Sequence, residues 1–171
     1  AAALLARGRQ GAGGVQVHRI HFPSPPKPVD GATQVTQFNT LLYERLIEWE
    51  SRLKGTSAVV AHDWLTMIVA EQARCRLGGR LVLTMHDTVI GKTFGKLANE
   101  DKYIAQIERW GCEAADQVIA VSAHVRGELL GVYGAKPDRV TVVPCGVDEG
   151  WFRGVRDEHL PHLRSALAPP H

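Results

Sequence analysis

Apolar positions along the chain change spacing several times, and each change predicts a new element. Residues 15–20 alternate between apolar and polar side chains, a period of two that predicts a β-strand. From Phe38 to Leu53 the apolar residues recur at intervals of three and four, with charged residues between them. That spacing predicts an amphipathic helix, because residues three and four apart share one helix face.

The rest of the chain repeats this change between short apolar runs and helical spacing. Short apolar runs bounded by turn residues predict buried strands. Segments with apolar residues at every third or fourth position predict the helices between those strands. The predicted strands are 57–61, 81–85, 118–121 and 140–143, and the predicted helices cover 69–77, 103–114 and 125–133.

This alternation of strands and helices predicts the fold class: an α/β protein with a doubly wound, mostly parallel, Rossmann-like sheet. The later strands are apolar on both faces, as expected of strands that helices cover on both sides. Ligands of such sheets bind beyond the carboxyl ends of the strands. The first candidates for chemistry are therefore the residues that follow the strands, namely His62, Asp63, His86, Asp87, Ser122, Cys145 and Gly146.

Composition narrows the class of protein. With 171 residues, of which 44% are hydrophobic and 22% charged, the chain fits one globular domain and neither a disordered chain nor a coiled coil. A net charge of +2 without a Lys/Arg stripe argues against nucleic acid as a partner. No apolar run approaches the roughly 20 residues that a membrane span needs.

The three cysteines, Cys75, Cys112 and Cys145, are too far apart for a zinc-binding CxxC pair. Such an odd, sparse set is typical of a reducing compartment, so we expect a cytoplasmic protein. Nothing local activates Cys145 as a nucleophile. The chain starts at Ala1 with neither an initiator Met nor a signal peptide, so we expect it to be a piece of a longer polypeptide.

Two histidine–aspartate doublets stand at predicted strand ends. His86 is able to hydrogen-bond a sugar hydroxyl or a phosphate, and its structural alternative is to hold the following loop. Asp87 either accepts hydrogen bonds from sugar hydroxyls or closes an Asx turn. We favour a functional role for His86 because it follows a parallel strand at its carboxyl end.

The second doublet, His62-Asp63, and the adjacent Trp64 allow two interpretations of equal weight. Asp63 or Thr66 either caps the next helix or faces a ligand, and Trp64 either joins the core or presents its ring to a sugar. The doublets do not predict a metal site. Neighbouring positions rarely aim at one ion, and no HExxH or CxxC motif accompanies them.

The loop after the strand 81–85 is rich in glycine and lysine. Gly91-Lys92-Thr93 resembles the end of a phosphate-binding P-loop, but that motif needs glycine at position 86, where this chain has histidine. A P-loop nucleoside triphosphatase is therefore excluded. Lys92 and Lys96 are cations beside a strand end, either near a ligand that the glycines let approach or in a mobile solvated loop.

Four segments of the chain follow one another in a specific order and spacing. They are VVAHDWLT at 59–66, LTMHDT at 83–88 with the glycine–lysine loop after it, ERWGCEAADQVIAVS at 108–122, and RVTVVPCGVD at 139–148 followed by Phe152. Together they resemble family 4 of the retaining glycosyltransferases, which is glycogen-synthase-like and has the GT-B fold. The resemblance covers residues 57–152 and departs from the family at Cys145, where asparagine is usual.

This resemblance implies an enzyme with two Rossmann-like domains and a cleft between them. It implies that His86 is catalytic and faces the transferred sugar. It also implies that His62 and Asp63 lie near the acceptor and that the loop 91–96 lies over the cleft. It also places Gly146 and Val147 near the hinge and the donor. From the strand-end positions and the resemblance together, the predicted substrate-binding residues are His62, Asp63, Trp64, Asp87, Thr88, Gly91, Lys92, Ser122, Gly146 and Val147.

The resemblance implies neither a metal nor a cofactor, because basic side chains and helix N-termini neutralise the phosphates of a nucleotide-sugar. The implied partners are a donor such as UDP- or ADP-glucose, a glucan or small sugar acceptor, and a C-terminal donor domain. Residues 1–152 would form the acceptor-side domain, although the family's opening strand and Gly-rich loop are not recognisable. Residues 153–171 would form a linker towards the donor domain, which this chain lacks.

The implied function is transfer of a hexose, first of all glucose, from a nucleotide-sugar to a glucan or other sugar with retention. We expect this chain to be inactive alone, because the groups that would stabilise the leaving diphosphate belong to the donor domain. The alternatives are a non-catalytic carbohydrate-binding or interaction module of the same fold, and a fragment of a sugar-nucleotide epimerase.

Overall fold

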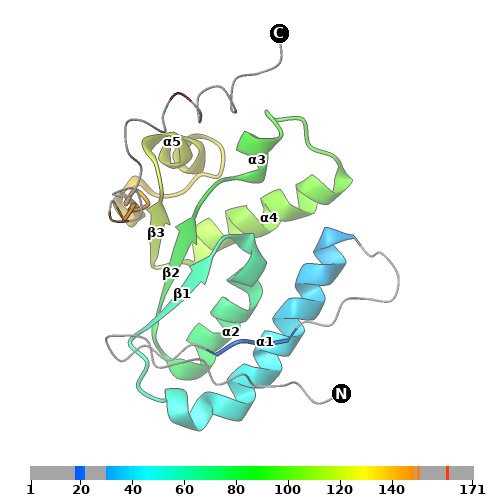
Figure 1. Cartoon of the computed structure of the whole chain (residues 1–171), viewed down its shortest axis with the longest axis vertical. Coiled ribbons are helices and arrows are strands. Elements are labelled where there is room, and N and C mark those ends of the chain that lie inside the picture. The colour runs from blue at the N-terminus through cyan, green and yellow to red at the C-terminus, as the bar shows by residue number, and fades with distance from the viewer. Residues whose placement is uncertain (1–17, 22–29, 149, 151–160, 162–171) are drawn as a thin grey trace.

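Helices and strands alternate along the computed structural model, which describes residues 18–21, 30–148, 150 and 161 (Figure 1). Two of the elements are single 3-10 turns, labelled η. In chain order the elements are α1 (Gly31–Leu53), β1 (Ala58–His62), η1 (Trp64–Thr66), α2 (Met67–Leu77), β2 (Arg80–Met85), α3 (Val89–Lys92), α4 (Asn99–Ala114), β3 (Gln117–Ala120), α5 (Ala123–Gly131), η2 (Pro137–Arg139) and β4 (Val140–Val142).

The four strands form one parallel sheet in the order β1-β2-β3-β4. Their register pairs His62 with Thr84 and Met85 with Ala120, so the carboxyl ends of β1, β2 and β3 lie beside one another. A backbone hydrogen bond of 3.3 Å from Val121 N to Met85 O continues this alignment beyond β3. The predicted α/β, Rossmann-like fold with a parallel sheet is confirmed.

The two faces of the sheet differ in burial. Helices α2, α4 and α5 all contribute to the core cluster that covers Ala61, Leu83 and Val118. Right-handed crossovers between strands in simple sequence order place every connecting helix on one side, which explains this arrangement. Val60 and Val143, on the other face, are 55% and 49% exposed. The expectation that helices cover both faces is therefore not met at these positions by the described residues.

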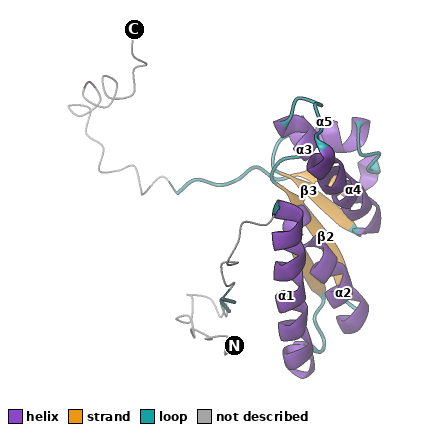
Figure 2. Ribbon diagram, turned by 90° about the vertical axis from the view of Figure 1, so that its right-hand side faces the viewer, coloured by secondary structure: helices purple, strands orange, loops and turns teal. Residues whose placement is uncertain are grey.

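Helix α1 begins at Gly31, well before the first residue of the predicted amphipathic pattern. Asp30 caps it, since its carboxylate accepts hydrogen bonds from Thr33 N at 2.8 Å and from Thr33 Oγ1 at 2.7 Å. The first turns are polar, so apolar spacing alone did not reveal them. The helix lies along α2 at the β1 end of the sheet (Figures 1 and 2).

The predicted strand 15–20 lies partly outside the described residues. Within 18–21, only His18 forms a β-bridge, and its ring lies 4.2 Å from that of Trp49 in α1, centroid to centroid. The predicted linker 153–171 lies outside the described residues except for Pro161, so the domain boundary at 152 stays a prediction. In the part of the chain that the structure describes, no helix is both long and apolar enough to cross a membrane.

Two glycines in helices offer a matched test of the packing. A Cβ on Gly111 would lie 2.9 Å from Leu83 Cδ2 and 3.3 Å from Met67 Sδ, whereas a Cβ on Gly127 would meet no atom within 4 Å. We expect Gly111→Ala to lower the free energy of unfolding by about 1 kcal/mol, because overpacking outweighs the gain in helix propensity. Gly127→Ala should raise it by about 0.5–1 kcal/mol. Urea unfolding measures both, and equal shifts of the same sign would contradict this packing.

Candidate functional site

The carboxyl ends of β1 and β2 bring two histidines into direct contact. His62 is the last residue of β1, and His86 follows the last residue of β2. Their rings are stacked at 22° with centroids 5.3 Å apart, and His62 Nδ1 lies 3.0 Å from His86 Nε2. One of these nitrogens must carry a hydrogen and the other must accept it. The exposed imidazoles therefore form one hydrogen-bonded pair at the strand ends.

Asp63 fastens the two strand ends together. Its N–H donates to Thr84 O at 2.9 Å, and its Oδ1 accepts from His86 N at 2.8 Å. Its backbone has φ 53° and ψ −174°, a region that non-glycine residues rarely adopt and that costs on the order of 1–3 kcal/mol. The strained residue thus positions the backbone of His86.

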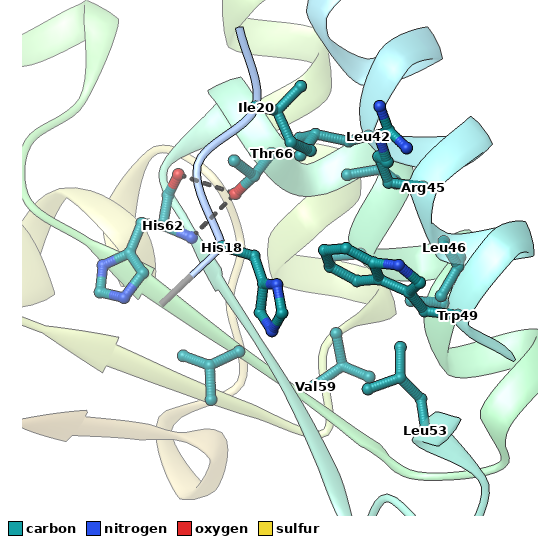
Figure 3. Close-up of a pocket in the computed structure, with 14 residues that line it drawn as sticks. His18, Ile20, Leu42, Arg45, Leu46, Trp49, Leu53, Val59, His62 and Thr66 are labelled. Atoms are coloured by element: carbon teal, nitrogen blue, oxygen red, sulfur yellow. Dashed lines mark hydrogen bonds between the residues drawn. The ribbon is translucent and has the colours of Figure 1, made fainter. Parts of the chain in front are cut away.

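Of the two interpretations of equal weight, the one in which Asp63 or Thr66 caps the following helix is wrong. Neither side chain makes a capping hydrogen bond at η1 or α2. Instead, Thr66 Oγ1 accepts from His62 N at 3.0 Å and donates to His62 O at 3.1 Å, which closes the chain reversal after β1 (Figure 3). The Asp63 side chain therefore bonds to the backbone of His86, and the Thr66 side chain bonds to the backbone of His62.

A short helix, α3, follows the second doublet. Thr88 is fully buried, its Oγ1 accepts from Gly91 N at 2.9 Å to cap α3, and its hydroxyl donates to Glu128 Oε2 at 2.8 Å. Asp87 closes no Asx turn and instead pairs with Lys92 Nζ at 2.8 Å. Both charged side chains are substantially exposed, so this ion pair is weak and open to exchange with a ligand.

Glu108 of α4 was not predicted to be part of the site. It is 2% exposed, and its oxygens accept from Val89 N at 3.0 and 3.2 Å and from the Tyr133 hydroxyl. Burial raises the pKa of Glu108 to about 7, against the lowering effect of these hydrogen bonds. Ile104, Glu108 and Cys112 are spaced by four, so a carboxylate on the inner face of α4 was the available signal.

The remaining predicted site residues either make contacts that stabilise the fold or lie away from the histidine pair. Trp64 packs against the core, and Ser122 Oγ caps α5 by accepting from Val125 N at 3.1 Å. A Cβ on Gly91 would lie 2.6 Å from Glu128 Oε1, so a side chain there would require the Glu128 carboxylate to shift. Gly146 and Val147 are exposed after β4, and no hydrogen bond joins them to the histidine pair among the described residues.

A cavity of about 350 Å³ lies between α1, β1, α2 and the segment that holds His18 and Ile20. Trp49, Leu46 and Val59 line it with other apolar side chains, and Arg45 stands at its side (Figure 3). The ring of His62 points away from Trp49 in this view. His62 and Thr66 also line the cavity, so it adjoins the histidine pair.

The strain at Asp63 gives a stability test. Glycine adopts positive φ freely but loses more entropy on folding, so at most positions alanine is the more stabilising of the two. At position 63 we expect the reverse: Asp63→Gly should be more stable than Asp63→Ala by about 1 kcal/mol, because alanine keeps the strain without the bond to His86 N. Chemical denaturation of both variants measures this, and an alanine variant as stable as the glycine variant would show that Asp63 is not strained.

Comparison with known proteins shows which family of proteins this chain resembles. A model described as Glycosyltransferase Family 4 matches residues 2–151. A D-inositol 3-phosphate glycosyltransferase of Catenulispora acidiphila is 37% identical over 158 residues, which are 88% of this chain and 35% of that protein. An α-maltose-1-phosphate synthase of Mycolicibacterium smegmatis is 35% identical over 98 residues, 56% of this chain and 25% of that protein.

A solved structure shares the fold. A sucrose-phosphate synthase chain from Thermosynechococcus elongatus superposes with a TM-score of 0.54 at 17% identity, over 92% of this chain and 76% of that chain. The present chain spans no more than about a third of the length of the curated relatives named above.

Proposed function

This chain belongs to glycosyltransferase family 4, and we propose that it is the acceptor-side domain of a retaining glycosyltransferase. The enzyme would move a hexose, first of all glucose, from a nucleotide-sugar such as UDP- or ADP-glucose to a sugar acceptor. The observation that carries this proposal is the contact between His62 and His86 at 3.0 Å, with Asp63 bonded to His86 N. Hydrogen-bond donors and acceptors for sugar hydroxyls thus meet at one edge of the sheet.

The chemistry of this edge suits the proposal. Imidazole nitrogens are able to donate to or accept from hydroxyl groups, and His86 is exposed beside the partly exposed Asp87. Lys92 lies 2.8 Å from Asp87 and would be able to exchange that partner for a ligand phosphate. We assign His86 to the transferred sugar, His62 and Asp87 to its hydroxyls or those of the acceptor, and Lys92 to a phosphate.

The donor phosphates would be bound by a second domain of a longer polypeptide that contains this chain. We propose no metal and no cofactor besides the nucleotide-sugar, since cationic side chains and helix N-termini are sufficient to neutralise phosphates. We also propose a cytoplasmic location, because the free Cys75, Cys112 and Cys145 suit a reducing compartment.

The acceptor is proposed from the relatives as well as from the site. Their names include D-inositol 3-phosphate glycosyltransferase and α-maltose-1-phosphate synthase, so a phosphorylated polyol and a phosphorylated sugar are candidates beside the glucan that the sequence resemblance implies. An exposed lysine beside the histidine pair favours an acceptor that carries a phosphate.

A transfer assay tests the proposal. UDP- and ADP-glucose are offered with D-inositol 3-phosphate or glycogen to the longer polypeptide and to this chain alone, and products are identified by mass spectrometry. We expect transfer with retained anomeric configuration by the longer polypeptide and none by this chain. Acceptor binding without transfer by either protein would identify a non-catalytic module instead, and an epimerised donor formed without acceptor would identify an epimerase.

A further inference from the structure

Two carboxylates hold the segment that follows β2 from inside the protein. Glu128 of α5 accepts the Thr88 hydroxyl at 2.8 Å, and Glu108 of α4 accepts Val89 N at 3.0 and 3.2 Å. His86 and Asp87 therefore stand just before two consecutive anchored residues. The contacts join elements that lie 19 and 40 residues further along the chain.

Glu108 is the more deeply buried of the two anchors. The residue is 2% exposed, and its carboxylate also accepts the Tyr133 hydroxyl, so its oxygens have partners from two other segments. No buried side-chain nitrogen or oxygen of the described residues lacks a hydrogen-bond partner. Burying a carboxylate is unfavourable, and an apolar side chain of similar volume is often as stable or more stable.

Capping of α3 does not require Glu108. Thr88, the N-cap residue, already accepts the Gly91 N–H from within the segment. Val89 is the first residue of the short helix α3. A local side chain or a water molecule commonly accepts the hydrogen bond of such a first N–H group. Glu108 instead ties this N–H to α4, and so fixes the distance of the segment from the core.

We propose that Glu108 is a positioning residue for the histidine pair: by holding Val89 N it keeps His86 within hydrogen-bonding distance of His62. His86 lies three residues before Val89, and it is also held by the bond from its N–H to Asp63 and by its ring contact with His62, while Thr88, two residues further on, is bonded to Glu128. With the Val89 anchor removed, the segment loses its hydrogen bonds to α4 and keeps the one from Thr88 to α5, so we expect it to shift and to carry His86 away from His62. The ligand side of this proposal rests on the proposed function of the site, whereas the positioning itself does not.

Three variants separate positioning from general stability. Glu108→Leu removes both acceptor oxygens at similar volume, and Glu108→Gln keeps one oxygen for Val89 N. Leu129→Ala opens a cavity in α5, where Leu129 is fully buried, and is a matched destabilised control that leaves Glu108 in place.

The test is made on this chain by NMR, with amide exchange at Val89 and ring-to-ring NOEs between His62 and His86 as readouts. We expect Glu108→Leu to speed exchange at Val89 by at least about tenfold and to abolish the NOEs, while Glu108→Gln keeps both near their original values. Leu129→Ala should keep the NOEs. Unchanged exchange and NOEs in Glu108→Leu, or loss of the NOEs in Leu129→Ala as well, would overturn the proposal.

A binding measurement distinguishes this proposal from that of the function. D-inositol 3-phosphate is titrated into the original protein and into Glu108→Leu. We expect weaker binding by the variant, with Glu108→Gln restoring it. If the original protein does not bind the probe although the NOEs respond to Glu108→Leu as expected, the positioning role stands and the proposed acceptor chemistry fails. If the NOEs respond but affinity does not change, Glu108 positions the histidines without serving the ligand, and that part of the proposal is overturned.

Discussion

Replacing His86 with alanine is expected to lower the rate of glycosyl transfer by the longer polypeptide about 100- to 1,000-fold. That range corresponds to the loss of one preorganised hydrogen-bonding group at the reacting centre. His86 is exposed, and its backbone bond to Asp63 does not involve the ring, so the fold should be unaffected. The measurement is kcat with UDP- or ADP-glucose and the acceptor that the transfer assay identifies.

His21→Ala is the control for this variant. His21 is also exposed, and it belongs to the described segment 18–21 and not to the strand ends that carry the histidine pair. We expect its kcat to match that of the original protein. A His86→Ala enzyme with less than about a threefold loss in kcat would mean that the histidine pair does not face the reacting sugar.

Raising the pH from about 4.5 to 8 is expected to lower the stability contributed by Glu108 by about 3 kcal/mol. Its pKa is raised from 4.5 to about 7 in the folded chain, and each unit corresponds to about 1.4 kcal/mol. Between these values the folded state binds the proton that the unfolded state has released, so stability falls as the pH rises. Above about pH 7 both states are ionised and the loss is complete.

The difference between the original protein and Glu108→Gln isolates this effect, since other titrating groups are common to both. The charged or titratable groups around Glu108 are Tyr133, Asp87, Asp63, Arg109 and Cys112. Urea unfolding at several pH values measures the free energy of each protein. Tyr133→Phe should enlarge the fall, because the lost hydroxyl no longer stabilises the carboxylate. Parallel pH curves for the original protein and Glu108→Gln would show that the carboxyl ionises normally.

Much of the fold followed from apolar spacing because the strands are short apolar runs between amphipathic helices. The runs 57–61, 81–85, 118–121 and 140–143 correspond to β1, β2, β3 and β4 with end shifts of one residue or so. The start of α1 and the whole of α3 could not be predicted in this way. Asp30 and Thr88 fix them by side-chain capping, and neither segment has an apolar period long enough to detect.

The contact between His62 and His86 was foreseeable for a topological reason. Neighbouring parallel strands end at the same edge, so residues that follow them meet. The roles of Asp63 and Glu108 were not foreseeable. One depends on a rare backbone conformation at φ 53°, and the other depends on how α4 packs under the segment after β2. Such contacts are set by tertiary packing and leave little trace in local sequence patterns.

The family model matches the region of the chain that contains the four segments from which the family was inferred. The matched region, residues 2–151, includes the strand-end doublets and the stretch 108–122 that contains Glu108. The predicted sugar, acceptor and donor sites remain proposals. Ser122 and Trp64, which were among the predicted substrate-binding residues, have a helix cap and a core contact as their visible roles.

The most direct test of a shared sugar-binding edge is a titration followed through the imidazole ring resonances of His62 and His86. D-inositol 3-phosphate and maltose are added separately to the isotope-labelled chain. We expect one of them to shift both rings along the same saturation curve, and His86→Ala to remove the response of His62. If the ring resonances of His62 and His86 do not move while the resonances of Trp49 and its neighbours do, the ligand occupies the apolar cavity. That result would contradict the proposal that this edge of the sheet binds sugars.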